Sequence, residues 1–452
     1  MGEAIIKKAL AIVIMFAMIG VLPFGKINAQ ELPLLTLDEC IQKGLKNDPN
    51  LVQSEENLKK AKNGVWSSYG NFLPYITLDL GYNKSSRSTQ YDFIEVYDPE
   101  GDSTYVKDLY TDRYYGTSFR ISQNLFSGLS RYFGLKASKY AEKSSQKWYD
   151  NQFLETIYNL KVSYFNVLRT MKLADVQKKA LERSDEQLRI TETRYELGSA
   201  ALSDVLKARV SNGEAKLNLI QAENNYRISM ARLNQLIGED VGRQYRVDTT
   251  VSVREVDYTL DNSIDHALEH NPQLQGYKYS LDSYKSNVRS AWGGYLPDLD
   301  FGYTLNYNQP ESFEFGDMFK ENRRSEYSLT LSLNLFDRFL TRNQVSNARA
   351  DLNTAKFNYH NYLNGLKLAV TESYLNLEKA QLSLEVARDK LASAQEDYKL
   401  AQEKYSLGAA TILDLLDAEV SLKTAEADVI DSEHSLNLAV ADLEKTLGIS
   451  EY

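Results

Sequence analysis

Two histidines and a glutamate in the second half of the chain have a spacing that could bind zinc. The run 266–270 reads His-Ala-Leu-Glu-His and fits the H-x-x-E-H pattern of some zinc proteases, in which imidazoles hold the metal and a carboxylate acts on bound water. Its counterparts in the internal repeat described below are Lys43, Lys46 and Asn47, which include no zinc ligand. We therefore expect a helix end here, with neither a metal site nor an enzyme.

The net charge, the cysteine count and the motif content exclude several classes of function. The chain has 452 residues and a net charge of −10, which argues against a nucleic-acid partner. Its single cysteine, Cys40, excludes a disulfide framework and a cysteine-based zinc site. The sequence has no glycine-rich phosphate loop and no serine or cysteine nucleophile motif. We expect no cofactor.

A pattern that carries aspartates occurs twice. Residues 194–208 read RYELGSAALSDVLKA, residues 404–418 read KYSLGAATILDLLDA, and seven identities recur at an offset of 210. Gly198 and Gly408 stand where a helix would end in a left-handed residue. Ser203 is the expected N-cap of the helix that follows the first glycine. The pattern predicts a tight turn between two long helices, made twice.

The chain begins with a targeting segment. Lys7 and Lys8 precede an apolar run at 9–22, which is too short to span a bilayer, and residues 27–29 form a possible cleavage site. We expect residues 1–29 to be a signal peptide.

The rest of the chain is a tandem repeat of helix, β-hairpin, long helix and return helix. The early elements match at an offset of 223 and the later ones at 210, as Pro49 with Pro272 and Asn-Leu-Phe at 124–126 with 334–336 illustrate. The predicted units are 30–240 for the first repeat, 241–258 for a linker and 259–452 for the second repeat.

Period-two alternation predicts four strands, and period-3.5 spacing predicts two rods. The strands are expected at 76–83, 115–125, 299–308 and 327–335, with the polar loop 83–112 facing outside. Each rod has about 70 residues and a length of roughly 105 Å. A heptad seam, which in the second rod runs from Leu363 to Tyr405, predicts left-handed coiled-coil packing.

Four strands cannot close a barrel, because the smallest bacterial barrels have about eight. If the strands enter a membrane, chains must share one barrel, with eight strands from two chains or twelve from three. The alternative is a soluble four-stranded sheet on an ordinary core, which leaves the rods without a partner.

These features resemble TolC-type outer-membrane channels over residues 36–450. The resemblance rests on the paired halves, the Leu-Pro entries to the strands, Asn-Leu-Phe before the rods and both Tyr-x-Leu-Gly…Asp turns. It implies a mostly α-helical homotrimer with a transmembrane twelve-strand β-barrel in outer-membrane lipid and a periplasmic α-helical coiled-coil barrel. Such channels are exit ducts of tripartite efflux or type I secretion machines. A periplasmic adaptor and an inner-membrane transporter of RND or ABC type complete them.

The resemblance also implies roles for residues of the turns. Asp414 and Asp417 match two pore-facing aspartates of the selectivity gate, and three copies of each would favour cations. The alternative for both is a solvated or capping role near a helix end. Tyr405 and Asp204 match the entrance latch, whose arginine position is Ala410 here. The expected adaptor-docking contacts are Leu197, Gly198, Ser199, Leu407, Gly408 and Ala409.

A secreted structural coiled-coil protein or adhesin is the rival reading. It explains the rods, but neither the four amphipathic strands nor the paired turns. The sequence leaves open the cargo and the transporter class.

Overall fold

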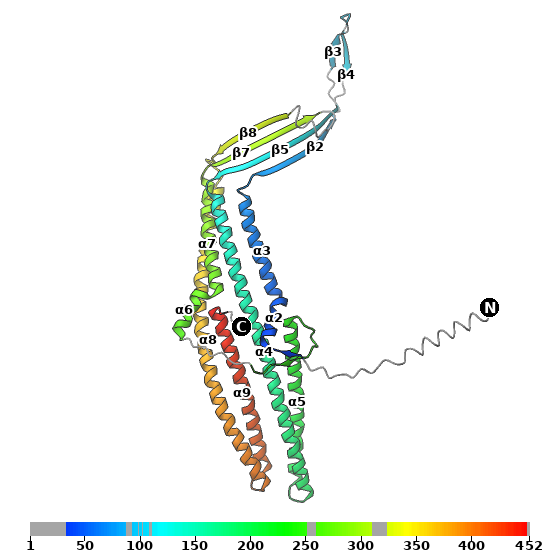
Figure 1. The fold of residues 1–452 in the computed structure, drawn as a ribbon, viewed down its shortest axis with the longest axis vertical. Helices are drawn as coiled ribbons and strands as arrows, with labels where there is room; N and C mark the ends of the chain where they lie inside the picture. Colours follow the sequence, from blue (N-terminus) through cyan, green and yellow to red (C-terminus); the bar gives the residue numbers. More distant parts are fainter. Residues whose placement is uncertain are drawn as a thin grey trace, which may run out of the picture.

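The structure is a computed structural model that describes residues 33–86, 93–97, 99–101, 103–107, 111–250, 259–309 and 323–449. The predicted signal peptide at 1–29 lies outside these residues, as do 251–258 of the expected linker. The described chain is mostly helical, as predicted, and its long helices lie beneath a curved sheet (Figure 1).

The elements follow the predicted order in both halves. The helices are α2 (Leu37–Asn47), α3 (Pro49–Gly70), α4 (Ser130–Glu196), α5 (Leu202–Ile237), α6 (Leu260–His270), α7 (Pro272–Trp292), the 3₁₀ turn η1 (Gly293–Tyr295), α8 (Leu340–Ser406) and α9 (Ile412–Leu447). The strands are β1 (Leu34–Leu35), β2 (Tyr75–Ser86), β3 (Phe93–Tyr97), β4 (Ser103–Lys107), β5 (Thr111–Ser127), β6 (Arg246–Val247), β7 (Asp298–Gln309) and β8 (Arg323–Ser332).

Short polar side chains fix where the early helices begin. The Thr36 hydroxyl accepts from the Glu39 amide at 3.2 Å, the Glu39 carboxylate accepts from the Thr36 amide at 3.5 Å, and the two bonds together form a capping box. The side chains of Asp48 and Asn271 cap α3 and α7, each followed by a proline in the first turn. The same local chemistry therefore starts the corresponding helices of both repeats.

The four predicted strands form one antiparallel sheet in the order β2-β5-β7-β8. The repeats meet at its centre, where β5 pairs with β7, and β2 and β8 are its edges. Alternate apolar side chains are exposed on both edge strands, among them Ile76, Leu78, Tyr327 and Leu329. In a single chain, the sheet therefore has an uncovered apolar face and two edge strands whose outer backbone groups have no partner strand.

Strand β8 ends earlier than predicted, at Ser332 instead of residue 335. Ser332 pairs with Asp298, the first residue of β7. The next partner would be Pro297, which has no amide hydrogen to donate, so the ladder stops there. Leu333 and Leu335 follow as exposed residues outside the strand.

Two small sheets were not predicted. Strands β3 and β4 pair within the expected loop 83–112 and project beyond the main sheet (Figure 1). Strands β1 and β6 pair in parallel, so that the start of the described chain is tied to a part of the expected linker 241–258.

Helix α4 is the centre of the helical layer. It packs on α3 and α7 in the half near the sheet, and on α5 and α9 in the half that leads to the turns. Helix α8 packs on α7 and α9, so α8 forms one side of the layer while α3 and α5 form the other. No helix of the described ranges is long and apolar enough to cross a lipid bilayer.

The buried cores repeat at the offset of 210. In the first repeat, Leu160 and Val167 of α4 lie in a core with residues of α5 and the first described segments. Val370 and Leu377 of α8 occupy the same places in the second repeat. From Leu366 to Tyr405, the buried residues of α8 all fall on the predicted heptad seam, which confirms the seam over that range. Thr341, Val345 and Ala355 are buried as well, but they precede the predicted start of the seam.

Candidate functional site at the paired helical turns

Both predicted turns lie together at the far end of the molecule from the sheet (Figure 1). Gly198 and Gly408 have φ of 71° and 75°, in the left-handed region that glycine adopts without strain. The amides of Ser199 and Ala409 donate to the carbonyls of Arg194 and Lys404 at 2.8 Å, as in a Schellman ending. The glycine prediction is therefore confirmed at both turns.

Asp414 is exposed and caps the helix of the second turn. Its carboxylate accepts from the Thr411 amide at 2.8 Å and hydroxyl at 2.7 Å, and the Thr411 hydroxyl accepts from the Asp414 amide at 3.3 Å. The hydroxyl bond, followed by the amide bond, lowers the pKa of Asp414 below its usual range. The carboxylate is therefore ionised at neutral pH.

Asp417 lies one turn further along α9 and is also exposed. It makes no hydrogen bond or ion pair within the described part of the chain, so capping does not account for it. Both aspartates are thus exposed and accessible in a single copy, while their place in a pore stays a prediction.

The first turn has a different cap from the one we expected. Helix α5 begins at Leu202, and its N-cap is Ala201, which offers no side-chain hydrogen bond. Ser203 lies inside the first helical turn, and its hydroxyl is 3.4 Å from Asp204 Oδ1. The N-cap prediction for Ser203 is wrong because the extended residue that precedes the helix is two positions earlier.

Tyr405 is the most enclosed side chain of the candidate latch. Its hydroxyl is 3.3 Å from Thr191 Oγ1, and its carbonyl accepts from Arg194 Nη1 at 2.9 Å. The Arg194 guanidinium also lies over the Tyr405 ring, 5.0 Å from its centroid. Asp204 is not a hydrogen-bond partner of Tyr405 within this chain, so a latch between them stays a prediction. Sequence reasoning missed Arg194 and Thr191, although both lie in or beside the doubled pattern.

A small apolar cluster joins the two turns behind these contacts. It contains Ala208 from α5, Tyr405 from α8, and Ile412 and Leu415 from α9. The corresponding Tyr195 is 43% exposed, whereas Tyr405 is 7% exposed. The two turns are therefore alike in backbone but not in how their tyrosines are held.

The predicted docking residues form the extreme tip. Leu197 is 78% exposed and Leu407 84%, and neither packs into the cluster behind them. Ser199 is exposed as well, and its hydroxyl donates to the Arg194 carbonyl at 3.0 Å. These side chains are accessible to a partner in a single copy.

Above the turns, α4 and α9 are joined by ion pairs that the sequence analysis did not find. The pairs, with the base on α4 and the acid on α9, are Lys161–Glu444 at 2.7 Å, Arg169–Asp431 at 2.7 Å, Lys172–Glu433 at 2.7 Å and Arg183–Glu426 at 3.2 Å. Arg183 is also 3.8 Å from the buried Glu419. Burial raises the pKa of Glu419, while the Arg183 charge opposes that shift. Ion pairs therefore connect the two repeats along much of the length over which α4 packs on α9.

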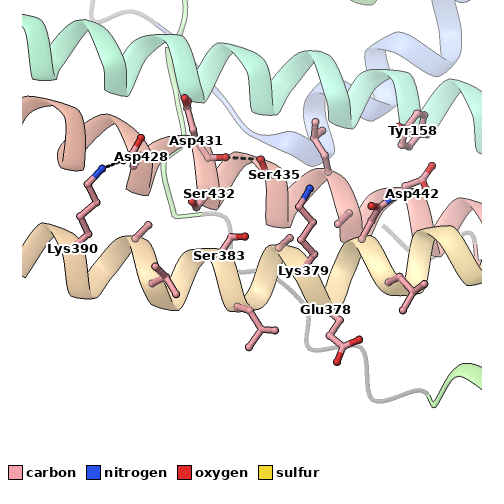
Figure 2. Close-up of a pocket in the computed structure, with 18 residues that line it drawn as sticks. Tyr158, Glu378, Lys379, Ser383, Lys390, Asp428, Asp431, Ser432, Ser435 and Asp442 are labelled. Carbon is pink, nitrogen blue, oxygen red and sulfur yellow. Dashed lines mark hydrogen bonds and ion pairs between the residues drawn. The ribbon is translucent and has the colours of Figure 1, made fainter.

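A groove of about 1060 Å³ lies between α8 and α9, with Tyr158 of α4 at its rim (Figure 2). Its lining mixes leucines with acidic and basic side chains. Asp428 is paired with Lys390 at 2.6 Å, and Asp442 accepts from the Ser373 hydroxyl at 2.6 Å. These carboxylates are engaged in structural contacts, and the lining has no arrangement of a nucleophile with a base.

The possible zinc motif forms a stacked pair at the end of α6. The rings of His266 and His270 have centroids 4.3 Å apart, and His270 Nδ1 is 3.1 Å from the His266 carbonyl oxygen. Among the described residues, no three His, Cys, Asp or Glu side chains are grouped so that they could hold a metal ion.

Comparison with known proteins identifies this architecture. The sequence profile described as "outer membrane efflux protein" matches residues 40–239 and 263–449, which is most of the chain. The chain belongs to the outer membrane efflux protein family. Its two matched segments contain both turns, and each segment falls within one of the two repeats.

Relatives and solved structures agree with this membership. The chain is 22% identical to the outer membrane efflux protein BepC of Brucella suis, over 71% of this chain and 69% of that protein. It is 21% identical to the outer membrane protein TolC of Escherichia coli, over 73% and 69%. The outer membrane channel CmeC of Campylobacter jejuni has the same fold, with a TM-score of 0.77 and 18% identity over 92% of this chain and 87% of that one.

Family membership decides between the readings left open by the sequence. The chain is an outer-membrane efflux channel protein with its helical part in the periplasm, and not an enzyme. A secreted structural coiled-coil protein or adhesin has no support from these matches.

Proposed function

We propose that three copies of this chain form one continuous exit duct. The observation that carries the proposal is the unfinished four-stranded sheet, with open edges at β2 and β8 and exposed apolar side chains. Three such sheets, joined edge to edge, supply three times four, or twelve, strands. Edge pairing between copies satisfies the backbone groups that lipid leaves unpaired, and the apolar side chains then face lipid.

The helical layer supports the same association. Leu206, Val210, Leu217 and Ile220 form an exposed apolar stripe on α5, with steps of three, four and seven residues. Helix α8 bears another stripe, on which Leu375 and Leu382 are seven residues apart. Because α5 and α8 lie on opposite sides of one chain, each stripe can pack on a neighbouring copy. The open edges of the sheet, β2 and β8, lie on the same two sides of the chain as α5 and α8 (Figure 1).

At the entrance, the proposed gate consists of Asp414 and Asp417. Three copies would place six carboxylates around the axis, which favours cations and disfavours anions. The exposed Leu197, Ser199 and Leu407 are the proposed contacts of a periplasmic adaptor, together with their neighbouring glycines and Ala409. An inner-membrane transporter of RND or ABC type would then deliver the cargo.

Two experiments test the duct. Purified protein in planar bilayers should conduct with a preference for cations, and a lack of conductance would contradict the proposal. Leu217→Glu should prevent assembly without unfolding the chain, because Leu217 is 68% exposed in a single copy. Lys216→Gln, at the adjacent exposed residue, is the matched control and should assemble normally. Normal assembly of Leu217→Glu would remove α5 from the contact between copies.

A further inference from the structure

The Arg194 side chain reaches from the end of α4 to the end of α8. Its Nη1 donates to the Tyr405 carbonyl at 2.9 Å, and the guanidinium lies 5.0 Å from the centroid of the Tyr405 ring. A Cβ on Gly408 would lie 3.8 Å from Arg194 Nη2, so the guanidinium also borders the turn itself. One side chain of the first repeat thus touches the backbone and the aromatic ring of the second.

This contact satisfies a specific need of helix α8. The last four carbonyls of a helix lack amide partners within the helix, and they form the negative end of its dipole. The Tyr405 carbonyl is one of them, and it also accepts from the Gly408 amide at 3.0 Å. A guanidinium placed there supplies both a hydrogen bond and a positive charge, and it lies over the tyrosine ring.

The reverse contact is absent from the described turns. Lys404 occupies the position of Arg194 in the second repeat, and its exposed side chain makes no hydrogen bond or ion pair within the described chain. The corresponding Tyr195 is largely exposed. Among the described residues, the cation–tyrosine contact between the turns is therefore made once, by Arg194 of the first turn with Tyr405 of the second.

We propose that Arg194 is a positioning residue that holds the second turn against α4 and so keeps the entrance narrow. The inference rests on the proposed duct and adds a residue that keeps the entrance of that duct narrow. The resemblance expects a latch arginine at position 410, where this chain has alanine. Arg194 offers a guanidinium to the same tyrosine from the opposite turn. Thr191, 3.3 Å from the Tyr405 hydroxyl, adds a second contact on the same side.

The first test compares full-length Arg194→Ala, Arg194→Lys and Arg189→Ala in planar bilayers. Arg194→Ala should raise the open fraction of the channel about tenfold, since it removes a stacked and hydrogen-bonded cation. Arg194→Lys keeps the charge and should restore part of the wild-type value. Arg189→Ala is the matched control, because Arg189 is exposed and, among the described residues, pairs only with Glu186 on its own helix. An open fraction that is the same in wild type and Arg194→Ala would overturn the proposal.

A second test does not require conductance. Hydrogen exchange of purified wild-type protein and variants reports the amides of residues 407–411. Arg194→Ala should speed their exchange about fivefold, while Arg189→Ala should not. Unchanged exchange would refute the role of Arg194 in holding the second turn, even if the protein fails to conduct. If the wild-type protein does not conduct but exchange is faster in Arg194→Ala, only the proposed duct is refuted.

Discussion

The ion pair between Lys161 and Glu444 should stabilise the contact of the two repeats. Its atoms are 2.7 Å apart, and each side chain is only 13% exposed. At that distance, and with an effective dielectric constant of about 20, the attraction is roughly 6 kcal/mol before desolvation is counted. Removing the two charges from water offsets most of it, so the net coupling should be about 2 kcal/mol.

The assay is a double-mutant cycle on the detergent-purified protein. Glu444→Gln and Lys161→Met should each lower the free energy of unfolding by about 2 kcal/mol, because each leaves a partly buried charge without its partner. The double variant should lose less than the sum of the two single losses. The control pair is Lys59 and Glu56, which is more than half exposed on α3 and should show little coupling. A Lys161–Glu444 coupling below about 0.5 kcal/mol would refute the reasoning.

Three further predictions follow from particular side chains. Glu419→Gln should stabilise the protein at neutral pH, because burial disfavours the charged carboxylate and Arg183 keeps Glu426 as a partner. For the same reason, Glu419 in the wild type should stabilise the fold increasingly as pH falls through its raised pKa. Thermal unfolding at several pH values measures this trend, and the opposite trend would show that the carboxylate is a net stabiliser. Gly128→Ala should impair folding, since φ is 56° and its Cβ would clash with the Gly293 carbonyl oxygen; normal yield and melting temperature would contradict the close approach. Asp417→Asn should weaken cation selectivity in bilayers without loss of stability, and unchanged selectivity would remove Asp417 from the gate.

Patterns within one element predicted most of the fold. The two glycine turns, the four strands and the heptad seam each depend on neighbouring residues, so their spacing is visible in the sequence. The hairpin of β3 and β4 was missed because its segment was read as part of the polar loop 83–112. The end of β8 was misplaced since it depends on Pro297, the residue just before the partner strand β7.

Contacts between distant helices could not be predicted in the same way. Lys161 and Glu444 are 283 residues apart, and their pairing depends on the rotation of α4 against α9. The Arg194 contact was missed for the same reason, since the latch was sought at position 410 on the second turn. At Asp414, the sequence left open a capping role and a gating role; the capping contact is present, and gating is still to be tested.

The mass of the oligomer extracted from the outer membrane tests the central claim most directly. Mass photometry or light scattering of the detergent-solubilised protein, corrected for detergent, gives the number of chains. The shared duct predicts three times the mass of the mature chain, because three sheets are needed to supply twelve strands. A monomer would contradict the account, since neither the sheet edges nor the exposed stripes of α5 and α8 would then have partners.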